Sequence, residues 1–279
     1  KYNEKRSFFT EGTELFQKGN LFYSRRIGGP PQNLEIDTNE VMIDPPLKTP
    51  LFNATKISGR TEDGWGIGFF NAITRNTHVE IQDTITNEKR EVLIEPVTNY
   101  NMIVIDRSFN QNSFVTFVNT NVNRREDFRN AHVFGLLASI TDKNMIRDIA
   151  IKTSFINDAN NRENGFSTFL NIEKINGNIK YGIRNYVESD KYDINDMGFL
   201  YQNNEINTEG FISYSIFSQD DLIAKKLGIK KGSCKLSFEH QTLYKPLEYS
   251  KLILKSNIDV VNKKHLFMRL EGRYFFQED

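Results

Sequence analysis

Long segments in which apolar and polar side chains alternate residue by residue are the feature that most limits how this chain can fold. Over residues 265–276 one parity is apolar apart from a glycine, and the other is largely ionic. The first comprises Leu266, Met268, Leu270, Gly272, Tyr274 and Phe276, and the second comprises His265, Phe267, Arg269, Glu271, Arg273 and Phe275. Successive side chains of a β-strand point to opposite faces, so this period of two predicts a strand with one apolar face and one ionic face.

The same alternation recurs along the chain. It is present in residues 148–155, and residues 51–60 and 65–74 flank a polar turn at 61–64. Residues 166–187 form a predicted hairpin around Asn176-Gly177, a dipeptide that suits a type I′ turn because both residues tolerate positive φ. With weaker segments near residues 100, 114, 133, 212, 236 and 252, the sequence predicts roughly a dozen strands of about ten residues.

Strand length and ionic faces favour one architecture over another. Strands of soluble proteins centre near 5–6 residues, whereas a tilted strand that crosses a bilayer needs about 9–11. Charges of both signs in successive inward positions, such as Arg269 and Glu271, suit an enclosed wet lumen. We therefore predict an all-β fold, an antiparallel transmembrane β-barrel, either complete or an incomplete portion of a larger one. A soluble all-β glycan-binding or hydrolytic protein stays open as an alternative.

Composition narrows the functional classes. Thirty-six Lys and Arg balance thirty-six Asp and Glu, and this zero net charge argues against a nucleic-acid partner held by phosphate contacts. Aromatic residues make up 12% of the chain, which argues against disorder. Cys234 has no cysteine to pair with, and the four histidines lack ligand spacing, so we expect no cofactor, no metal and no catalytic residue.

Two stretches do not have the strand pattern. Residues 29–50 hold most of the prolines and predict an extended loop or an inward-folded segment. Residues 220–232 combine Leu222, Ile223 and Leu227 with lysines and predict one short helix in a loop. We therefore divide the chain into an initial segment, residues 1–50, that contains an inward-folded or plug-like region at 8–28, and the barrel strands and loops of residues 51–279.

Five short segments carry a family resemblance in sequence order. They are Lys5–Gly12, Leu21–Gly28, Asp63–Gly68, Ile94–Tyr100 and Asp193–Leu200. Together they resemble a domain of unknown function of Bacteroidota envelope proteins, in which an outer-membrane β-barrel follows a module similar to family-nine carbohydrate-binding domains. The resemblance implies a location in the bacterial outer membrane and brings no known catalytic residues. That module is not found in this sequence and the barrel of the family usually runs on further, so we expect an internal piece of a longer protein.

These observations lead to a functional hypothesis. We expect a non-catalytic outer-membrane barrel, either a channel or uptake component or a plugged barrel, and the alternative is a structural subunit of a multi-protein secretion or assembly complex. The expected partners are outer-membrane lipid, lipopolysaccharide and other envelope proteins. The charged residues that we expect to line the lumen are Lys56, Arg60, Lys152, Lys180, Arg184, Arg269, Glu271 and Arg273.

Three polar clusters each have a functional and a plainer interpretation. Asp190, Asp193 and Asp196 offer oxygen ligands to calcium, but they lack the EF-hand order, so we favour a solvated turn. The arginines of Ser24–Arg26 suit a phosphate or a lipid head group, but we favour ion pairs inside the barrel. The lysines of residues 225–231 suit an anionic surface, although such runs usually lie in wet loops.

Aromatic residues provide a last expectation. Amphipathic rings concentrate at the two interfaces of a bilayer, where one side of the ring is apolar and the other is wet. We expect an outward-facing girdle formed by Trp65, Tyr100, Tyr181, Tyr186, Tyr214 and Tyr274.

Overall fold

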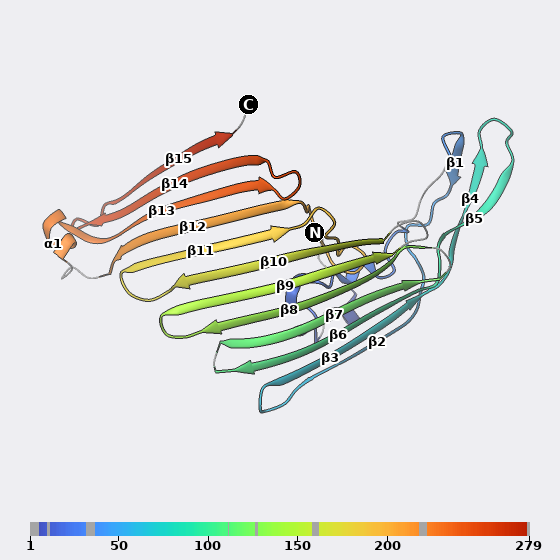
Figure 1. The fold of residues 1–279 in the computed structure, drawn as a ribbon, viewed down its shortest axis with the longest axis horizontal. Coiled ribbons are helices and arrows are strands. Elements are labelled where there is room, and N and C mark those ends of the chain that lie inside the picture. The colour runs from blue at the N-terminus through green and yellow to red at the C-terminus, as the bar shows by residue number, and fades with distance from the viewer. Residues whose placement is uncertain are drawn as a thin grey trace.

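Two antiparallel β-sheets make up most of the protein (Figure 1). The computed structural model describes residues 6–9, 12–31, 37–110, 112–125, 128–157, 162–217 and 222–277. Within these ranges, a large sheet holds twelve strands in the order β15-β14-β13-β12-β11-β10-β9-β8-β7-β6-β3-β2, and a small sheet holds three in the order β1-β4-β5. The predicted all-β antiparallel class is therefore confirmed.

The strands of the large sheet are long. They are β2 (Leu51–Arg60), β3 (Trp65–Thr74), β6 (Thr98–Phe109), β7 (Ser113–Arg124), β8 (Asn130–Thr141), β9 (Met145–Asn157), β10 (Arg162–Lys174), β11 (Ile179–Glu188), β12 (Glu205–Ile216), β13 (Ile229–Leu243), β14 (Tyr249–Asn262) and β15 (Phe267–Gln277). The predicted hairpin is present as β10 and β11, and Gly177 in its turn has a positive φ of 86°, but Asn176 does not have a positive φ, so the turn is not of type I′.

The large sheet is open in the described part of the chain. Each strand pairs with the next strand along the chain, except that β3 pairs directly with β6, because β4 and β5 between them in the sequence belong to the small sheet. The two edges are formed by β2 and β15. The predicted closure into a barrel is not found. Because β2 and β15 stand at opposite ends of the strand order, closure requires either their direct pairing or further strands between them.

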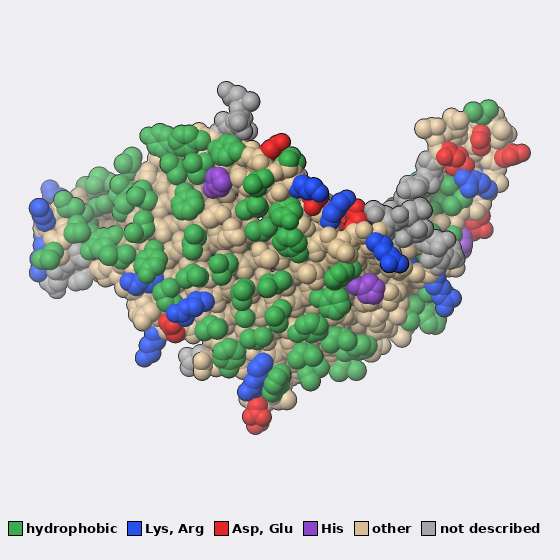
Figure 2. All heavy atoms as spheres, viewed as in Figure 1, with side chains coloured by type: hydrophobic (Ala, Val, Ile, Leu, Met, Phe, Trp, Pro, Cys, Tyr) green, Lys and Arg blue, Asp and Glu red, His purple; other side chains and the backbone are tan. Residues whose placement is uncertain are grey.

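The two faces of the large sheet differ in what covers them. Residues that pair directly across neighbouring strands share a face, so the register assigns every side chain to one side. Val104 and Val118 pair on the inner face and are 0% exposed, whereas the next pair, Ile105 and Phe117, points to the outer face and is 42% and 38% exposed. Figure 2 shows this outer face, with hydrophobic side chains distributed over the strands.

The initial segment of the chain covers part of the inner face. Residues 6–9 and 12–31 include three short 3-10 turns, η1 (Ser7–Phe9), η2 (Lys18–Asn20) and η3 (Ser24–Arg26). Phe16, Leu21 and Ile27 of this segment are at most 1% exposed and belong to one core cluster with wall residues such as Phe70 and Met102. This cluster is the hydrophobic core of the large sheet, and it forms because the inner face of β3 and β6–β8 is largely apolar and needs a cover.

The loop at 189–204 between β11 and β12 lies on the same inner face. Its residues Tyr192, Ile194 and Met197 belong to the core cluster. A close approach of backbones makes this docking possible, because a Cβ on Gly165 of β10 would lie 2.2 Å from the Tyr192 nitrogen. The position therefore admits only glycine without displacement of the loop.

The small sheet corrects the prediction for residues 29–50. The sheet contains β1 (Glu40–Ile43), β4 (Thr77–Asp83) and β5 (Lys89–Glu95), with Val79, Ile81 and Ile94 in its own core. Residues 40–43 thus form a strand rather than a loop, because the prolines stand on either side of β1 and leave its backbone free to pair with β4. The predicted helix is present as α1 (Leu222–Leu227), and residues 220 and 221 of the predicted range lie outside the described residues.

We expect Gly165→Ala to loosen the loop at 189–204, because the added methyl group would overlap the backbone of Lys191 and Tyr192. Overpacking of this kind costs about 1–3 kcal/mol of unfolding free energy. The measurement is the denaturation midpoint of the detergent-solubilised protein, together with the rate of protease cleavage within the loop. Gly59→Ala on β2 is the matched control, since a Cβ there meets no atom within 4 Å. Equal midpoints and cleavage rates for the two variants would contradict the packing described here.

Candidate functional site on the inner face

All eight charged residues expected to line a lumen lie on the inner face. In the strand register, each of them pairs with a residue of the inner face on a neighbouring strand. The pairs are Lys56 with Phe70, Arg60 with Gly66, Lys152 with Ser167, Lys180 with Ser213, Arg184 with Glu209, Arg269 with Asp259, Glu271 with Asn257 and Arg273 with Lys255. The residues divide between two regions of this face, because residues 6–31 and 189–204 cover the part formed by β2, β3 and β6–β8.

In the covered half, charged wall residues bind the initial segment. Lys56 donates from Nζ to the Phe8 carbonyl oxygen at 2.5 Å. Asp106 of β6 is fully buried and accepts the Thr116 hydroxyl at 2.5 Å. It also forms ion pairs with Arg60 at 2.8 Å and with Lys18 of the initial segment at 3.5 Å. A single buried carboxylate thus holds together the edge strand β2, the wall and the segment that covers it.

In the open half, from β10 to β15, charges of opposite sign pair across strands. Arg184 lies 3.3 Å from Glu173, and Glu239 lies 2.9 Å from Lys251 and 3.2 Å from Lys255. Except for Lys251, these side chains border a depression of about 370 Å³, which is also lined by Glu209, Phe211, Lys235 and Asn257. Ion-paired walls of this kind retain water and interact with polar solutes rather than with apolar ones.

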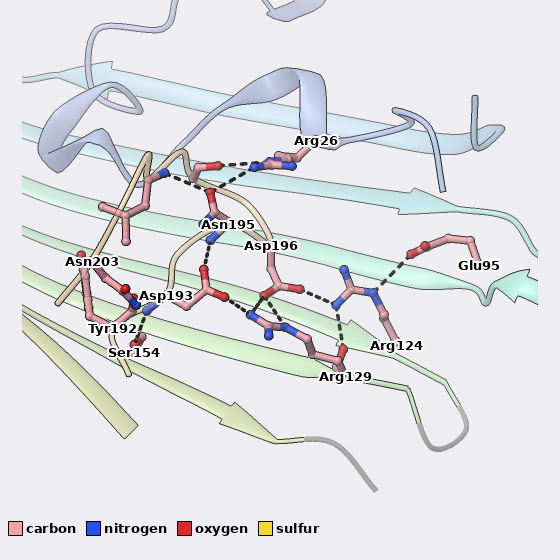
Figure 3. Close-up of polar contacts among 12 residues, drawn as sticks. Arg26, Glu95, Arg124, Arg129, Ser154, Tyr192, Asp193, Asn195, Asp196 and Asn203 are labelled. Carbon is pink, nitrogen blue, oxygen red and sulfur yellow. Dashed lines mark hydrogen bonds and ion pairs between the residues drawn. The ribbon is translucent and has the colours of Figure 1, made fainter. Parts of the chain in front are cut away.

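A second charged network fixes the loop at 189–204 (Figure 3). The Arg124 side chain at the end of β7 is 4% exposed and lies 3.2 Å from Glu95 and 2.7 Å from Asp196. Arg129 pairs with the same Asp196 at 2.9 Å and with Asp193 at 2.5 Å. Two arginines from the wall therefore meet two aspartates from the loop, and each buried charge has a partner of opposite sign.

The electrostatic state of Asp193 follows from these contacts. Burial raises the pKa of its carboxyl, but the hydrogen bond from the Asn195 backbone N–H and the positive charge of Arg129 lower the pKa by more. The pKa therefore lies below the ordinary aspartate value, and the carboxyl is ionised in the folded protein. The Asp193 backbone nitrogen also donates to the Ser154 hydroxyl of β9 at 3.1 Å.

The loop in turn holds the initial segment. The Tyr23 backbone nitrogen donates to the Met197 carbonyl oxygen at 2.7 Å, and the Tyr23 ring contacts Phe199 edge-on at 5.6 Å. Arg26 donates to the Asn195 side-chain oxygen at 3.0 Å and to the Gly198 carbonyl oxygen at 3.4 Å. The wall, the loop and the initial segment are thus linked in that order by polar contacts on top of a shared apolar core.

Two expectations about the polar clusters need correction here. Asp193 and Asp196 are not in a solvated turn, because Arg124 and Arg129 draw them onto the wall. Arg26 makes the hydrogen bonds just described with loop residues rather than only ion pairs inside a lumen.

Two members of the expected aromatic girdle also face inward. Tyr100 pairs with Ala72 and is buried in the core, and Tyr186 pairs with Phe169 on the inner face. The reason lies in their parity, because Met102 and Val104 share the face of Tyr100, and Arg184 shares the face of Tyr186.

Sequence reasoning missed Glu95, Arg124 and Arg129. The run of charged residues from 124 to 129 has the composition of a wet turn, and nothing local marks Arg124 as buried. A signal did exist in the family resemblance, because its segments Leu21–Gly28, Ile94–Tyr100 and Asp193–Leu200 supply Arg26, Glu95 and both aspartates of this one network.

Comparison with known families gives a match that covers the whole chain. The profile of the family described as a domain of unknown function (DUF5916) matches residues 1–279. The chain belongs to this family. No curated protein and no solved structure shows a match. Among the described residues there is no helix with the length and apolar character needed to cross a membrane, and no group of histidine, cysteine and acidic side chains is arranged to bind a metal ion.

We expect Asp196→Asn to destabilise the protein by about 1.5–3 kcal/mol, because Arg124 and Arg129 each lose a charged hydrogen-bond partner, although they keep Glu95 and Asp193 as ion-pair partners. Chemical denaturation of the solubilised protein measures the loss. Glu80→Gln is the control, since its ion pair with Lys89 involves side chains that are about half exposed and is worth less than about 1 kcal/mol. A loss for Asp196→Asn as small as that of the control would show that the network does not bear on stability.

Acid should release the same loop. Because the folded pKa of Asp193 is lower than the unfolded value of about 3.9, its contribution to stability is complete above that pH and disappears as the pH falls through the folded pKa. We therefore expect the difference in unfolding free energy between the native protein and Asp193→Asn to be constant near neutral pH and to shrink below about pH 4. Denaturation curves across this range measure it, and a difference that does not change with pH would contradict the assignment.

Proposed function

We propose that this chain is part of an envelope protein of the Bacteroidota type and forms wall strands of a non-catalytic β-barrel in the bacterial outer membrane. In this proposal the outer face contacts lipid, and the inner face surrounds a lumen that the initial segment partly fills. The apolar outer face is the observation that carries the proposal. The resemblance of the five sequence segments to an envelope family supports the location.

The outer face is apolar across the whole width of the sheet (Figure 2). Every strand of the large sheet contributes at least one large hydrophobic side chain there, between 38% and 67% exposed: Ile57, Ile67, Ile103, Phe117, Leu136, Ile151, Leu170, Ile183, Ile212, Leu236, Leu254 and Leu270. The largest apolar patch on a typical monomer in water covers about 300–600 Å². A surface twelve strands wide needs an apolar environment, and lipid hydrocarbon supplies one.

Polar groups form the border of this apolar surface on the side of the small sheet. On the outer face, the Asn71 side-chain nitrogen donates to the side-chain oxygens of Asn99 and Asn101 at 2.6 and 2.8 Å. On the next two strands, the Asn121 side-chain nitrogen forms a hydrogen bond with His132 Nδ1. Amides that satisfy one another in a row are suited to the edge of a hydrocarbon layer, where unpaired polar groups are costly.

Strand length and the polar inner face fit the same proposal. The twelve strands have 10–15 residues, which is sufficient to cross a bilayer at a tilt. The core beneath residues 6–31 favours a plugged barrel over a wide open channel, since Phe16, Leu21 and Ile27 are buried against the wall. The wall from β10 to β15 keeps an ion-paired surface of the kind that a wet passage requires.

Paired cysteine variants on β11 test the proposal. In a Cys234→Ser background, Ile183→Cys places a thiol on the outer face and Arg184→Cys places one on the inner face. After reconstitution of the full chain into lipid vesicles, we expect a water-soluble maleimide to label Arg184→Cys at least about tenfold faster than Ile183→Cys, because thiol reactivity requires water and a thiolate. A bimane label on Ile183→Cys should be quenched by a nitroxide deep in the acyl chains.

The soluble alternative gives a different result. A protein that leaves membranes in a carbonate wash, with both thiols equally reactive and no quenching by the nitroxide, would show that the outer face is not in lipid. Fluorescence of Trp65 provides a check that each variant is folded, because this single tryptophan lies on β3, far along the sheet from β11.

A further inference from the structure

Cationic and apolar side chains lie together at the end of the sheet where β12 joins β13 and β14 joins β15. The connection after β12 contains α1, and Leu222 and Leu227 of this helix are 85% and 64% exposed. Leu266 in the turn before β15 is 61% exposed. Between and beside these side chains are six lysines: Lys225, Lys226, Lys230, Lys231, Lys263 and Lys264.

Strand pairing brings the two connections side by side. Ile229 pairs with Asn262, and Lys231 pairs with Val261. Lys230 Nζ lies 2.7 Å from His265 Nε2 across the same gap. Figure 2 shows the basic side chains at the tip where α1 lies, directly beside the hydrophobic side chains of the outer face. We call residues 222–231 and 262–266 the basic tip.

The basic tip is poorly explained as an ordinary wet loop. Its six lysines outnumber Asp220 and Asp221, which directly precede α1 in the sequence, so like charges are concentrated at this end of the sheet at a cost in electrostatic free energy. The exposed leucines add a cost in water that an ordinary polar turn would not have. Both costs fall if the surface meets a layer that is anionic on its outside and apolar beneath.

We propose that the basic tip docks on the anionic phospholipid head groups of the leaflet that it meets. This inference rests on the proposed membrane position of the outer face, with which the basic tip is continuous through Leu266 in the turn before β15 and through Met268 and Leu270 of β15. Leucines of α1 would lie at the boundary between head groups and acyl chains, and the lysine stems would extend along it while their ammonium groups remain among phosphates.

The length of the connections indicates which leaflet this is. At the end of the sheet that carries the basic tip, the other four connections are short, at residues 61–64, 110–112, 142–144 and 175–178. The opposite end carries the small sheet and the loop at 189–204. In outer-membrane barrels the short turns are periplasmic, so the proposal assigns the basic tip to phospholipids of the inner leaflet rather than to lipopolysaccharide.

The test uses a fluorescent reporter at the basic tip. A bimane label on Leu227→Cys, in the Cys234→Ser background, is reconstituted in vesicles of phosphatidylcholine alone and of phosphatidylcholine with phosphatidylglycerol. A nitroxide on the lipid head group serves as the quencher. We expect quenching to be at least about twofold stronger in the anionic vesicles at low salt, since each lysine near such a surface strengthens the attraction roughly fivefold. It should return to the neutral-vesicle level near 1 M salt, where the screening length is about 3 Å.

Two sets of charge variants assign the effect to the basic tip. The triple variant Lys226→Gln, Lys231→Gln and Lys263→Gln should lose the difference between the vesicles. The matched triple variant Lys48→Gln, Lys89→Gln and Lys245→Gln removes the same charge at the opposite end of the protein and should retain it. Equal quenching in the two kinds of vesicle, or an equal effect of the two triple variants, would overturn the inference.

The label on Ile183→Cys separates this inference from the proposed function. If that label is quenched by the deep nitroxide while the label on Leu227→Cys does not respond to phosphatidylglycerol, only the docking of the basic tip is wrong. If the Ile183→Cys label is not quenched either, the outer face is not in lipid and both proposals are wrong.

Discussion

The strict two-residue period of the large sheet is the constraint on which the rest of the structure depends. A shift of one residue in the pairing of any strand would move its whole set of side chains to the other face. Such a shift in β11 would place Arg184 among the apolar side chains of the outer face and Ile183 among the charges of the inner face. Because each face tolerates only side chains of its own kind, each strand has only one register that suits both faces. Of the eleven pairings in the large sheet, nine keep an unbroken register along their length.

That constraint explains why the inner face has two regions. Where residues 6–31 cover the wall, the inner positions of β6 are Tyr100, Met102 and Val104, which are as apolar as the outer positions. Where no such cover exists, the inner positions carry Arg184, Glu239 and their partners. The composition of each strand therefore records what lies against it. The boundary between the two regions falls near β9 and β10, where Gly165 admits the loop at 189–204.

The same division determines how much the sequence could predict. Alternation is clear in β11 and β15 because one face is wet, and the inner positions of Arg184, Arg269 and Arg273 were predicted, although Tyr186 of β11 was assigned to the wrong side. It is weak in β6–β8 because both faces are apolar, which is why Tyr100 was assigned to the wrong side. The partners of Arg124 were not predictable from local pattern at all, since Asp196 is 72 positions away in the chain. The pairing of β1 with β4 and the open edges of the large sheet are likewise long-range outcomes that no period reveals.

The energies of the contacts indicate how firmly the initial segment is held. Burial of a large apolar side chain contributes about 1.5–3 kcal/mol, and Phe9, Leu15, Phe16, Leu21 and Ile27 are all buried against the wall. A buried ion-pair network is often close to neutral when compared with apolar residues of the same volume, although loss of one partner is costly. The arginine and aspartate network therefore determines where the loop sits, while the apolar core supplies most of the attraction. A segment held in this way is a permanent part of the wall rather than a gate that a change of charge would open, so any passage for polar solutes would follow the ion-paired surface from β10 to β15.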